Sequence, residues 1–386
     1  MMIRAALARA PGRFLEIEDV TIEAPRPTEV LVRFAASGIC HTDLTGMASW
    51  PTTQSPMVFG HEGAGVVEAL GSAVTQLRPG DTVVASFRSC RECDFCRDGR
   101  LPYCRLHGQL NFRGSRADDS TSLNLSGTRI HSGFFGQSSF ATHALIEAES
   151  LIRVDGRMPL HLAAPLGCGV QTGAGTVLNV LRPGPDSVLA VFGGGGVGMA
   201  AVLAARALDV RDVIVVDPVV SRLDLAMDLG ATDARHPIEL STGSPIEATH
   251  AFVSTDAPGA LGQALRTVRK NGVVATVAAK GLNEALAELT FGGPEGRVTP
   301  AVIEVDAVDL IGSGRTIHGV IQGNSNPAEI IPQLAGLYLT GRFPVDRIVT
   351  TYPFGEINKA IDDIQRGAAI KAVVLMPDLS EMRDVR

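Results

Sequence analysis

The sequence predicts an α/β protein in which a doubly wound parallel sheet is joined to a second, β-rich domain. Between residues 187 and 277, short apolar runs alternate with helical stretches, which is the pattern of βαβ units and a parallel sheet. Over the first 90 residues, short strands instead follow one another between turns. The chain has 386 residues, 45% of them hydrophobic, and is long enough for two or three domains.

In the β-rich part, strands are expected where β-branched and apolar residues gather between turn signals. They cover residues 30–34, 65–70 and 82–85. Residues 91–135 are polar and lack periodicity, which predicts a long loop that something must tie down. Strands return over 137–155.

The second half alternates buried strands with helices. In chain order we expect strands over 187–192, 213–216, 251–254 and 273–277, and helices over 199–208 and 222–229. The last part predicts helices over 330–339 and 357–365, a strand near 348 and a final strand over 371–375. Residues 281–300 are rich in glycine and proline and form an insertion between two strands.

A glycine-rich turn follows the first buried strand of this half. Its candidate ligand-binding residues are Gly193, Gly195, Gly196, Val197 and Gly198, which contain the pattern G-x-G-x-x-G. Such a turn is common by itself, but here it precedes a helix, and Asp217 ends the next strand roughly twenty residues later. Because backbone amides and a helix N-terminus suit a pyrophosphate, we predict a dinucleotide-binding domain of the Rossmann type.

Asp217 also predicts which dinucleotide binds. A carboxylate at this position accepts hydrogen bonds from the ribose 2′-hydroxyl and repels a 2′-phosphate. The next residue is Pro218 rather than an arginine. The sequence therefore favours NAD over NADP, while the simpler interpretation of Asp217 is a residue that forms a turn at a strand end.

The six cysteines of the chain divide into two groups. The first group has the spacing C-x2-C-x2-C-x7-C and consists of Cys90, Cys93, Cys96 and Cys104. Four thiolates joined by short loops form a closed tetrahedral site, for which zinc is the expected ion. Because such a site has no position for water, we expect it to be structural; the alternative is a set of free structural cysteines.

The second group combines scattered residues. Cys40 and Cys168 are far apart in the sequence, with His61 and Glu62 between them. Each is ambiguous alone, since a lone buried cysteine or histidine is more often structural. Together, two thiolates and one imidazole with an open fourth position are one of the ligand sets of catalytic zinc. Asp43 is placed to orient His61 through its second ring nitrogen.

The residues around His61 carry a resemblance to a known family. Gly60-His61-Glu62, followed by Gly65, Gly71 and Val74, resembles the signature of zinc-dependent medium-chain alcohol dehydrogenases. The four-cysteine segment, the glycine turn and Asp217 follow at that family's spacing, so the resemblance covers essentially the whole chain. Residues 111–116 and 133–140 are similar to segments of aryl-alcohol (benzyl alcohol) dehydrogenases and of bacterial geraniol and perillyl alcohol enzymes.

The resemblance implies a domain layout. A GroES-like catalytic domain would cover residues 1–169 and carry the structural zinc lobe at 88–106. The NAD-binding Rossmann domain would cover 170–320, and residues 321–386 would return to the catalytic domain.

It also implies roles for single residues. Cys40, His61 and Cys168 would hold catalytic zinc, so that the chain binds two zinc ions in all. Thr42 matches the position whose hydroxyl takes the proton of the alcohol, and Glu62 matches a carboxylate behind the metal. The positions that contact NAD are His41 and Lys371 at the pyrophosphate, Arg222 near the adenosine, and Val277.

The chain departs from many relatives at one position of the proton relay. Where they have a histidine five residues after the first zinc cysteine, this chain has Thr45. Threonine is no base near neutral pH, so the relay must end at ribose, water or another group. Relatives of the benzyl alcohol type also tend to lack this histidine.

The resemblance implies an enzyme that interconverts primary alcohols, aryl or allylic ones such as benzyl alcohol or geraniol, and aldehydes by hydride transfer to NAD. One alternative is an S-(hydroxymethyl)glutathione (formaldehyde) dehydrogenase, whose long loop is similar. Another, from a different class, is a redox-inactive NAD-binding protein on the same fold. Such proteins commonly lose zinc ligands, and this ligand set is complete.

Composition argues against several other partners. The net charge of −7 disfavours nucleic acid. The basic cluster Arg97, Arg100, Arg105, Arg113 and Arg116 is interpreted as a solvated surface. No stretch approaches the roughly 18 apolar residues of a membrane span, and the N-terminus lacks a signal segment. We therefore expect a cytoplasmic enzyme that does not bind membranes, and by family precedent a homodimer or homotetramer.

Overall fold

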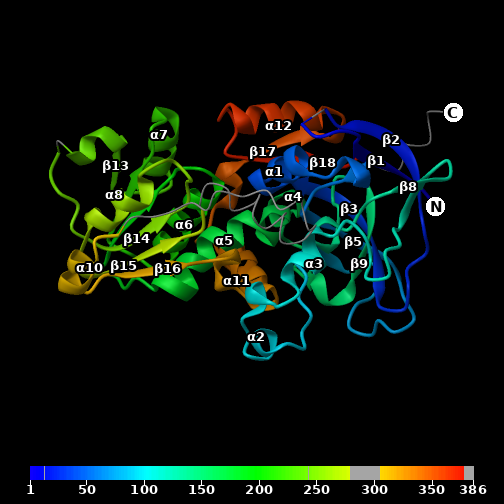
Figure 1. Cartoon of the computed structure of the whole chain (residues 1–386), viewed down its shortest axis with the longest axis horizontal. Coiled ribbons are helices and arrows are strands. Elements are labelled where there is room, and N and C mark those ends of the chain that lie inside the picture. The colour runs from blue at the N-terminus through cyan, green and yellow to red at the C-terminus, as the bar shows by residue number, and fades with distance from the viewer. Residues whose placement is uncertain (13, 242, 279–304, 378–386) are drawn as a thin grey trace.

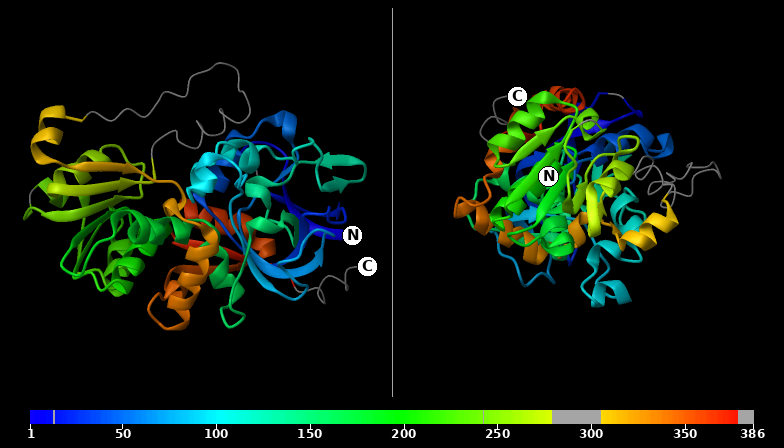
Figure 2. Two further views of the ribbon diagram at one scale, coloured as in Figure 1. Left: turned by 90° about the horizontal axis from the view of Figure 1, so that it is seen from below. Right: turned by 90° about the vertical axis from the view of Figure 1, so that its left-hand side faces the viewer.

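The computed structural model describes residues 1–12, 14–241, 243–278 and 305–377. The molecule is elongated, with the parallel sheet and its helices at one end and most of the remaining strands at the other (Figure 1). The left view of Figure 2 shows the same division from another side. The predicted fold class is confirmed. The insertion predicted over 281–300 lies outside the described residues.

Six of the described strands form the parallel sheet, in the order β13-β12-β11-β14-β15-β16. They are β11 (Val188–Phe192), β12 (Asp212–Val216), β13 (Asp233–Arg235), β14 (Ala248–Val253), β15 (Val268–Thr276) and β16 (Thr316–Gly319). The chain runs outward from β11 to β13 and then returns to β14 on the other side of β11. The carboxyl end of β11 is therefore the switch point of the sheet, where open α/β sheets bind their ligands.

The helices of this half follow the strands, as the alternation predicts. They are α6 (Gly196–Ala207), α7 (Val220–Asp228), α8 (Ala260–Thr267) and α10 (Ala307–Ser313). The preceding helix, α5 (Gly169–Gly175), packs directly on α6: a Cβ atom on Gly173 would lie 2.0 Å from the carbonyl oxygen of Val197. This close approach joins the segment after Cys168 to the helix that begins at the glycine-rich turn.

The β-rich half contains two sheets. The first has the order β4-β1-β2-β7-β8, and the second has the order β10-β6-β5-β3-β18-β17 with β9 paired to β3. The N-terminal members are β1 (Met2–Ala8), β2 (Glu16–Ile22), β3 (Glu29–Gly38), β4 (Met57–Val58), β5 (Glu62–Leu70), β6 (Thr82–Ala85), β9 (His143–Glu147) and β10 (Leu151–Arg153). Helix α1 (His41–Ser49), which was not predicted, follows β3.

The last part of the chain returns to this half. It contains α11 (Pro327–Leu339), β17 (Val349–Pro353), α12 (Ile357–Gln365) and β18 (Lys371–Leu375). Strand β18 pairs in parallel with β17 and antiparallel with β3. This pairing brings Lys371 beside segments more than three hundred residues earlier, as its hydrogen bond to Ile39 shows.

The prediction of a structureless loop over 91–135 is wrong. The segment contains α2 (Asp94–Arg97), the 3-10 turn η2 (Leu101–Tyr103), α3 (His107–Phe112), β7 (Leu123–Leu125) and β8 (Thr128–Ile130). These elements have three to six residues each, too few for periodicity to reveal them. Strand β7 exists because it pairs with β2, a contact that local pattern does not encode.

The basic cluster in this segment is only partly solvated, as one of its arginines shows. Arg116 is 14% exposed and donates to Glu29 at 2.6 and 2.9 Å and to Glu23 at 2.8 Å. The expectation of a solvated surface is therefore wrong for Arg116, because its charge neutralises the buried Glu29.

One hydrophobic cluster extends through both halves. It includes Ala36, Ala64 and Val84 of the β-rich sheet together with Val191 of β11 and Ala200 of α6. Since the two halves share this core, they support each other where they meet. Within the described residues, no helix has the length and apolar character needed to cross a membrane.

Candidate active site

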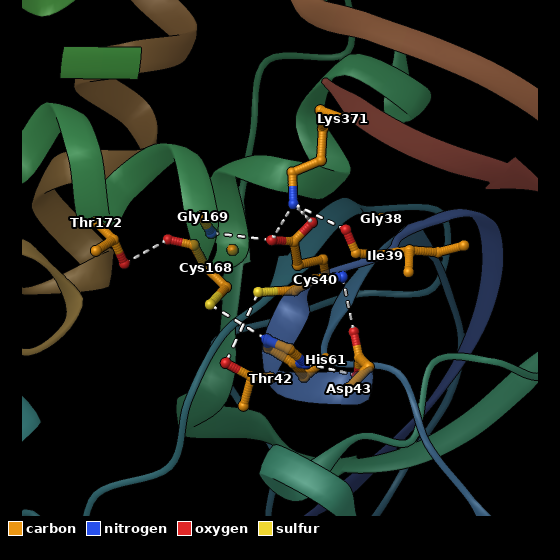
Figure 3. Close-up of polar contacts among 12 residues, drawn as sticks. Gly38, Ile39, Cys40, Thr42, Asp43, His61, Cys168, Gly169, Thr172 and Lys371 are labelled. Atoms are coloured by element: carbon orange, nitrogen blue, oxygen red, sulfur yellow. Dashed lines mark hydrogen bonds and ion pairs between the residues drawn. The ribbon is translucent and has the colours of Figure 1, made fainter. Parts of the chain in front are cut away.

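Three predicted ligands meet between the two halves. Cys40 directly precedes α1, His61 directly precedes β5, and Cys168 lies between the 3-10 turn η5 (Ala164–Gly167) and α5. One ligand atom from each of these residues, and one from Glu62, all lie within 4.8 Å of one another. Figure 3 shows both sulfur atoms and the imidazole pointing toward a common centre. Two thiolates and an imidazole at this spacing fit a zinc ion and leave its fourth position open.

Asp43 holds the imidazole in one orientation. Its fully buried carboxylate accepts from His61 Nδ1 at 2.7 Å and from the backbone N–H groups of Gly60 at 3.1 Å and Cys40 at 3.0 Å. Because Nδ1 is engaged in this way, Nε2 is the ring nitrogen that faces the two cysteines, 3.2 Å from Cys168 Sγ. Asp43 therefore holds His61 through its second ring nitrogen, as expected from the sequence, in the way that a carboxylate orients a metal-binding histidine.

The electrostatics of this cluster favour a thiolate at Cys40 and keep protons on Cys168 and His61. The hydrogen bond from Cys168 holds the pKa of the Cys40 thiol well below its usual value, although burial opposes the shift. Burial would lower the pKa of His61, but the charge and hydrogen bond of Asp43 raise it to about 10. The hydrogen bond to Cys40, together with burial, raises the pKa of the Cys168 thiol. Because a metal ion binds thiolates and a neutral imidazole, zinc would displace the protons of Cys168 and His61.

Glu62 and Lys371 form a buried ion pair behind the cysteines. Lys371 Nζ lies 2.8 Å from both carboxylate oxygens of Glu62 and also donates to the carbonyl of Ile39 at 3.1 Å. The backbone N–H of Gly169 donates to Glu62 Oε1 at 2.9 Å. Burial would lower the pKa of Lys371, but the carboxylate of Glu62 raises it, so the ammonium group stays charged. The pair ties β5, α5 and β18 together beside the site.

Lys371 also lies close to the glycine-rich turn. A Cβ atom on Gly196 would lie 3.7 Å from Lys371 Cε. The residue that the resemblance places at the NAD pyrophosphate thus pairs with Glu62 and lies close to the predicted nucleotide turn. His41, placed at the pyrophosphate by the same resemblance, is exposed at the start of α1.

The glycine-rich turn has the geometry that its motif requires. Gly193 adopts a φ of +101°, and a Cβ atom on Gly198 would lie 1.8 Å from the carbonyl oxygen of Gly193. Asp217 is buried and accepts from the N–H of Gly194 at 2.7 Å. The carboxylate therefore fixes the turn from the adjacent strand.

Arg222 lies beside Asp217, where the adenosine of NAD is predicted to bind. Its Nη1 lies 3.5 Å from Asp217 Oδ2, while its buried Nε has no hydrogen-bond partner among the described residues. Buried hydrogen-bond donors without a partner are rare in folded proteins. The Nε atom of Arg222 therefore fits a site that binds a polar ligand. Val277 follows the end of β15 and is half-buried.

The other four cysteines form a separate cluster. Ligand atoms of Cys90, Cys93, Cys96 and Cys104 all lie within 4.8 Å of one another. Backbone N–H groups point at two of the sulfurs, from Cys93 to Cys90 at 3.3 Å and from Cys90 to Cys104 at 3.2 Å. Such bonds stabilise thiolates, so the lobe fits a closed four-sulfur zinc site.

Thr42, which the resemblance implies as the proton acceptor, lies beside Cys40. Its Oγ1 is 3.8 Å from Cys40 Sγ, and its side chain points toward the cluster (Figure 3). Thr45 lies one turn further along α1 and is half-buried.

Sequence reasoning missed an aromatic group that packs against the site. The ring of Phe135 stacks on His61 at a centroid distance of 4.4 Å and an interplanar angle of 24°. Phe134 approaches His61 edge-on at 5.7 Å. Trp50, Phe59 and Phe112 pack around Phe134. The feature of the sequence that could have predicted this aromatic group is the Phe134-Phe135 pair, which lies in one of the segments that carry the family resemblance.

Comparison with known proteins agrees with this geometry. Residues 26–156 match the alcohol dehydrogenase GroES-like domain, and residues 196–336 match the zinc-binding dehydrogenase family. A geraniol dehydrogenase of Castellaniella defragrans is 39% identical, over 96% of this chain and 97% of its own length. An NDMA-dependent alcohol dehydrogenase of Amycolatopsis methanolica is 33% identical, over 97% of this chain and 99% of its own length.

Two solved structures are also similar over nearly the whole chain. A zinc-binding-domain alcohol dehydrogenase of Burkholderia ambifaria is 41% identical with a TM-score of 0.89, covering 98% of this chain and 100% of the other. Benzyl alcohol dehydrogenase of Acinetobacter calcoaceticus is 35% identical with a TM-score of 0.87, at the same coverage. The chain therefore belongs to the zinc-binding alcohol dehydrogenase family, and it is an alcohol–aldehyde oxidoreductase that uses zinc and NAD.

Proposed function

We propose that this enzyme interconverts aryl or allylic primary alcohols and their aldehydes. The observation that carries the proposal is the aromatic group beside the metal ligands, with Phe135 stacked on His61 and Phe134 edge-on to the same ring. Aromatic rings attract flat, unsaturated groups more than short saturated chains. The geraniol and benzyl alcohol enzymes among the relatives support the same substrate class.

In this proposal Cys40, His61 and Cys168 hold the catalytic zinc, and the four-cysteine lobe holds the structural one. Zinc, when bound, supplies a Lewis acid that polarises the oxygen of the alcohol or aldehyde, and NAD exchanges the hydride. The residues of the chain position these groups. Asp43 fixes the ring of His61, and the Glu62–Lys371 pair keeps a compensated charge behind the two cysteines.

Thr42 is proposed to accept the proton of the alcohol and pass it on. Its hydroxyl can accept one hydrogen bond while it donates another, as a relay requires. With Thr45 at the next turn of α1, the proton must leave through the ribose of NAD, through water or through another group.

NAD is proposed to lie across the switch point of the parallel sheet. Its pyrophosphate would meet the turn from Gly193 to Gly198, beside Lys371, and the resemblance implies a contact with His41 as well. Its adenosine ribose would meet Asp217 and Arg222. The proposed boundaries are 1–169 for the catalytic domain, 170–320 for the NAD-binding domain and 321–386 for the return.

We also propose a cytoplasmic homo-oligomer. All six cysteines are free thiols, as suits a reducing compartment. Among the described strands, β16 lies at the edge of the parallel sheet, and the neighbouring α10 exposes Val308 (81%) and Ile311 (83%). An edge strand of the described sheet beside exposed apolar side chains supports pairing with a second copy.

Turnover of benzyl alcohol, geraniol and ethanol with NAD tests the substrate class. We expect higher kcat/KM for benzyl alcohol and geraniol than for ethanol. The glutathione–formaldehyde adduct is included because its oxidation would favour the alternative formaldehyde dehydrogenase. A preference for ethanol would contradict the aromatic-site argument, and NAD binding without any turnover would contradict the enzyme assignment.

A further inference from the structure

Gln322 occupies an unusual position next to one of the proposed zinc ligands. Its Nε2 lies 3.4 Å from Cys168 Sγ, although the two residues are 154 positions apart in the chain. Both side chains are buried, with exposed fractions of 9% for Gln322 and 6% for Cys168. A buried amide at this distance from a sulfur atom can donate to it when the sulfur is a metal-bound thiolate.

The partners of the amide oxygen determine which end of the side chain faces the sulfur. Gln322 Oε1 accepts from Gln171 Nε2 at 3.3 Å and from Thr172 Oγ1 at 3.4 Å. The NH2 group of Gln171 is a donor, so an orientation with the Gln322 oxygen toward α5 and its NH2 group toward Cys168 pairs a donor with an acceptor at both ends.

The network extends to the β-rich half. Gln171, which is fully buried, also donates to Ser86 Oγ at 2.9 Å, and Ser86 donates to the carbonyl oxygen of Gly167 at 2.8 Å. Gly167 directly precedes Cys168. The amide of Gln322 and the backbone before Cys168 are therefore held by the same set of hydrogen bonds.

The backbone around Gln322 is strained in a way that favours this contact. Gln322, Gly323 and Asn324 adopt consecutive positive φ values of 51°, 65° and 49°. Two of the three residues are not glycine, and such conformations persist only where the surroundings impose them. Strained backbone of this kind is concentrated at functional sites.

Contacts from three segments impose the strained turn. Tyr103, next to Cys104 of the four-cysteine lobe, donates its hydroxyl to Asn324 Oδ1 at 2.7 Å. Asn179 donates to the carbonyl oxygen of Gly323 at 3.0 Å. A Cβ atom on Gly323 would lie 2.5 Å from the carbonyl oxygen of Gln171, so the turn is pressed against α5.

We propose that Gln322 is a positioning residue for the catalytic metal site, which acts by donating a hydrogen bond to the thiolate of Cys168. This inference rests on the proposed role of Cys168 as a zinc ligand. The hydrogen bond withdraws electron density from the sulfur and holds the ligand in place. Loss of an outer-shell partner typically costs about 10–100-fold in metal affinity or activity.

The test uses Gln322→Met, which keeps the length of the side chain but removes the donor, and Gln322→Glu, which keeps its shape. The enzyme is loaded with zinc, and release of metal to a chelator is timed, with the four-cysteine site as internal reference. In a second preparation cobalt replaces zinc, and the sulfur-to-cobalt charge-transfer band is recorded. Gln365→Glu, the same chemical change on the exposed end of α12, is the control.

We expect both Gln322 variants to release the catalytic metal about 10–100-fold faster, while the lobe metal is unaffected. In Gln322→Met the band should move to lower energy, because a sulfur without its hydrogen bond gives up charge more easily. A merely structural role would change stability without moving the band. Gln365→Glu should match the unaltered enzyme.

Two results would overturn the proposal, and they are distinguishable. If Cys168→Ala loses one metal ion but both Gln322 variants keep the original release rate and band, the ligand assignment stands and the role of Gln322 is wrong. If Cys168→Ala retains both metal ions, the ligand assignment itself fails, and the role of Gln322 fails with it.

Discussion

Replacing Asp43 by asparagine should weaken the catalytic metal site while leaving the fold intact. The substitution keeps the size and shape of a fully buried side chain but removes its charge. In the structure the carboxylate accepts three N–H groups, from His61, Gly60 and Cys40. An asparagine can present its oxygen to His61 and Gly60, but its NH2 group then faces the N–H of Cys40.

The expected loss of zinc affinity follows from the number of hydrogen bonds that the asparagine cannot accept. One hydrogen bond to a charged acceptor is lost, which is worth about 1.5–3 kcal/mol. Outer-shell partners of metal-binding histidines typically contribute about 10–100-fold in affinity, which corresponds to about 1.4–2.8 kcal/mol. The two estimates agree, so Asp43→Asn should bind the catalytic zinc about 10–100-fold more weakly.

The assay is zinc release from Asp43→Asn under increasing chelator, with the zinc of the four-cysteine lobe as internal reference. Asp81→Asn is the matched control, because Asp81 accepts one N–H, from Arg78 at 2.9 Å in an exposed turn, which an amide oxygen can replace. Only the first variant should lose its catalytic zinc early. Release at the original rate would refute the argument that Asp43 maintains the imidazole as a ligand.

Three further predictions follow from individual contacts. Asp217→Gly should relax the preference for NAD, measured as the ratio of kcat/KM with NAD and NADP; an unchanged ratio would remove the argument for the carboxylate. Phe135→Leu should lower kcat/KM for benzyl alcohol relative to ethanol by about 2- to 10-fold, since an aromatic pair is worth about 0.5–1.5 kcal/mol, and equal losses on both substrates would contradict this. Arg116→Ala should lower the free energy of unfolding by about 2 kcal/mol, because Glu29 loses its bidentate partner. This value lies between those for surface and buried ion pairs. Denaturant titration measures the change, and an unchanged midpoint would show that the ion pair does not contribute to stability.

Much of the fold was predictable because it rests on local pattern. The strands over 82–85 and 371–375 and the helix over 357–365 coincide with β6, β18 and α12. Each combines a clear apolar pattern with turn or helix-end signals. The segment over 91–135 was not predictable in this way, because its elements are too short for a period and depend on partners elsewhere.

The candidate site was likewise predictable only in part from the sequence. The sequence by itself determined which residue types are available: six cysteines in two groups, one histidine with a nearby aspartate, and a glycine turn followed by an acidic strand end. These features are visible because metal ligation and phosphate binding demand particular side chains or the absence of one.

Only the tertiary structure decided which groups surround those ligands. The stacking of Phe135 on His61, the pairing of Lys371 with Glu62 and the amide of Gln322 at Cys168 all join positions separated by more than seventy residues. No local pattern encodes such contacts, because they depend on the register of β18 against β3 and on the packing of a strained turn against α5. The chemistry of the ligands was therefore readable in the sequence, while their orientation and electrostatics arise from folding.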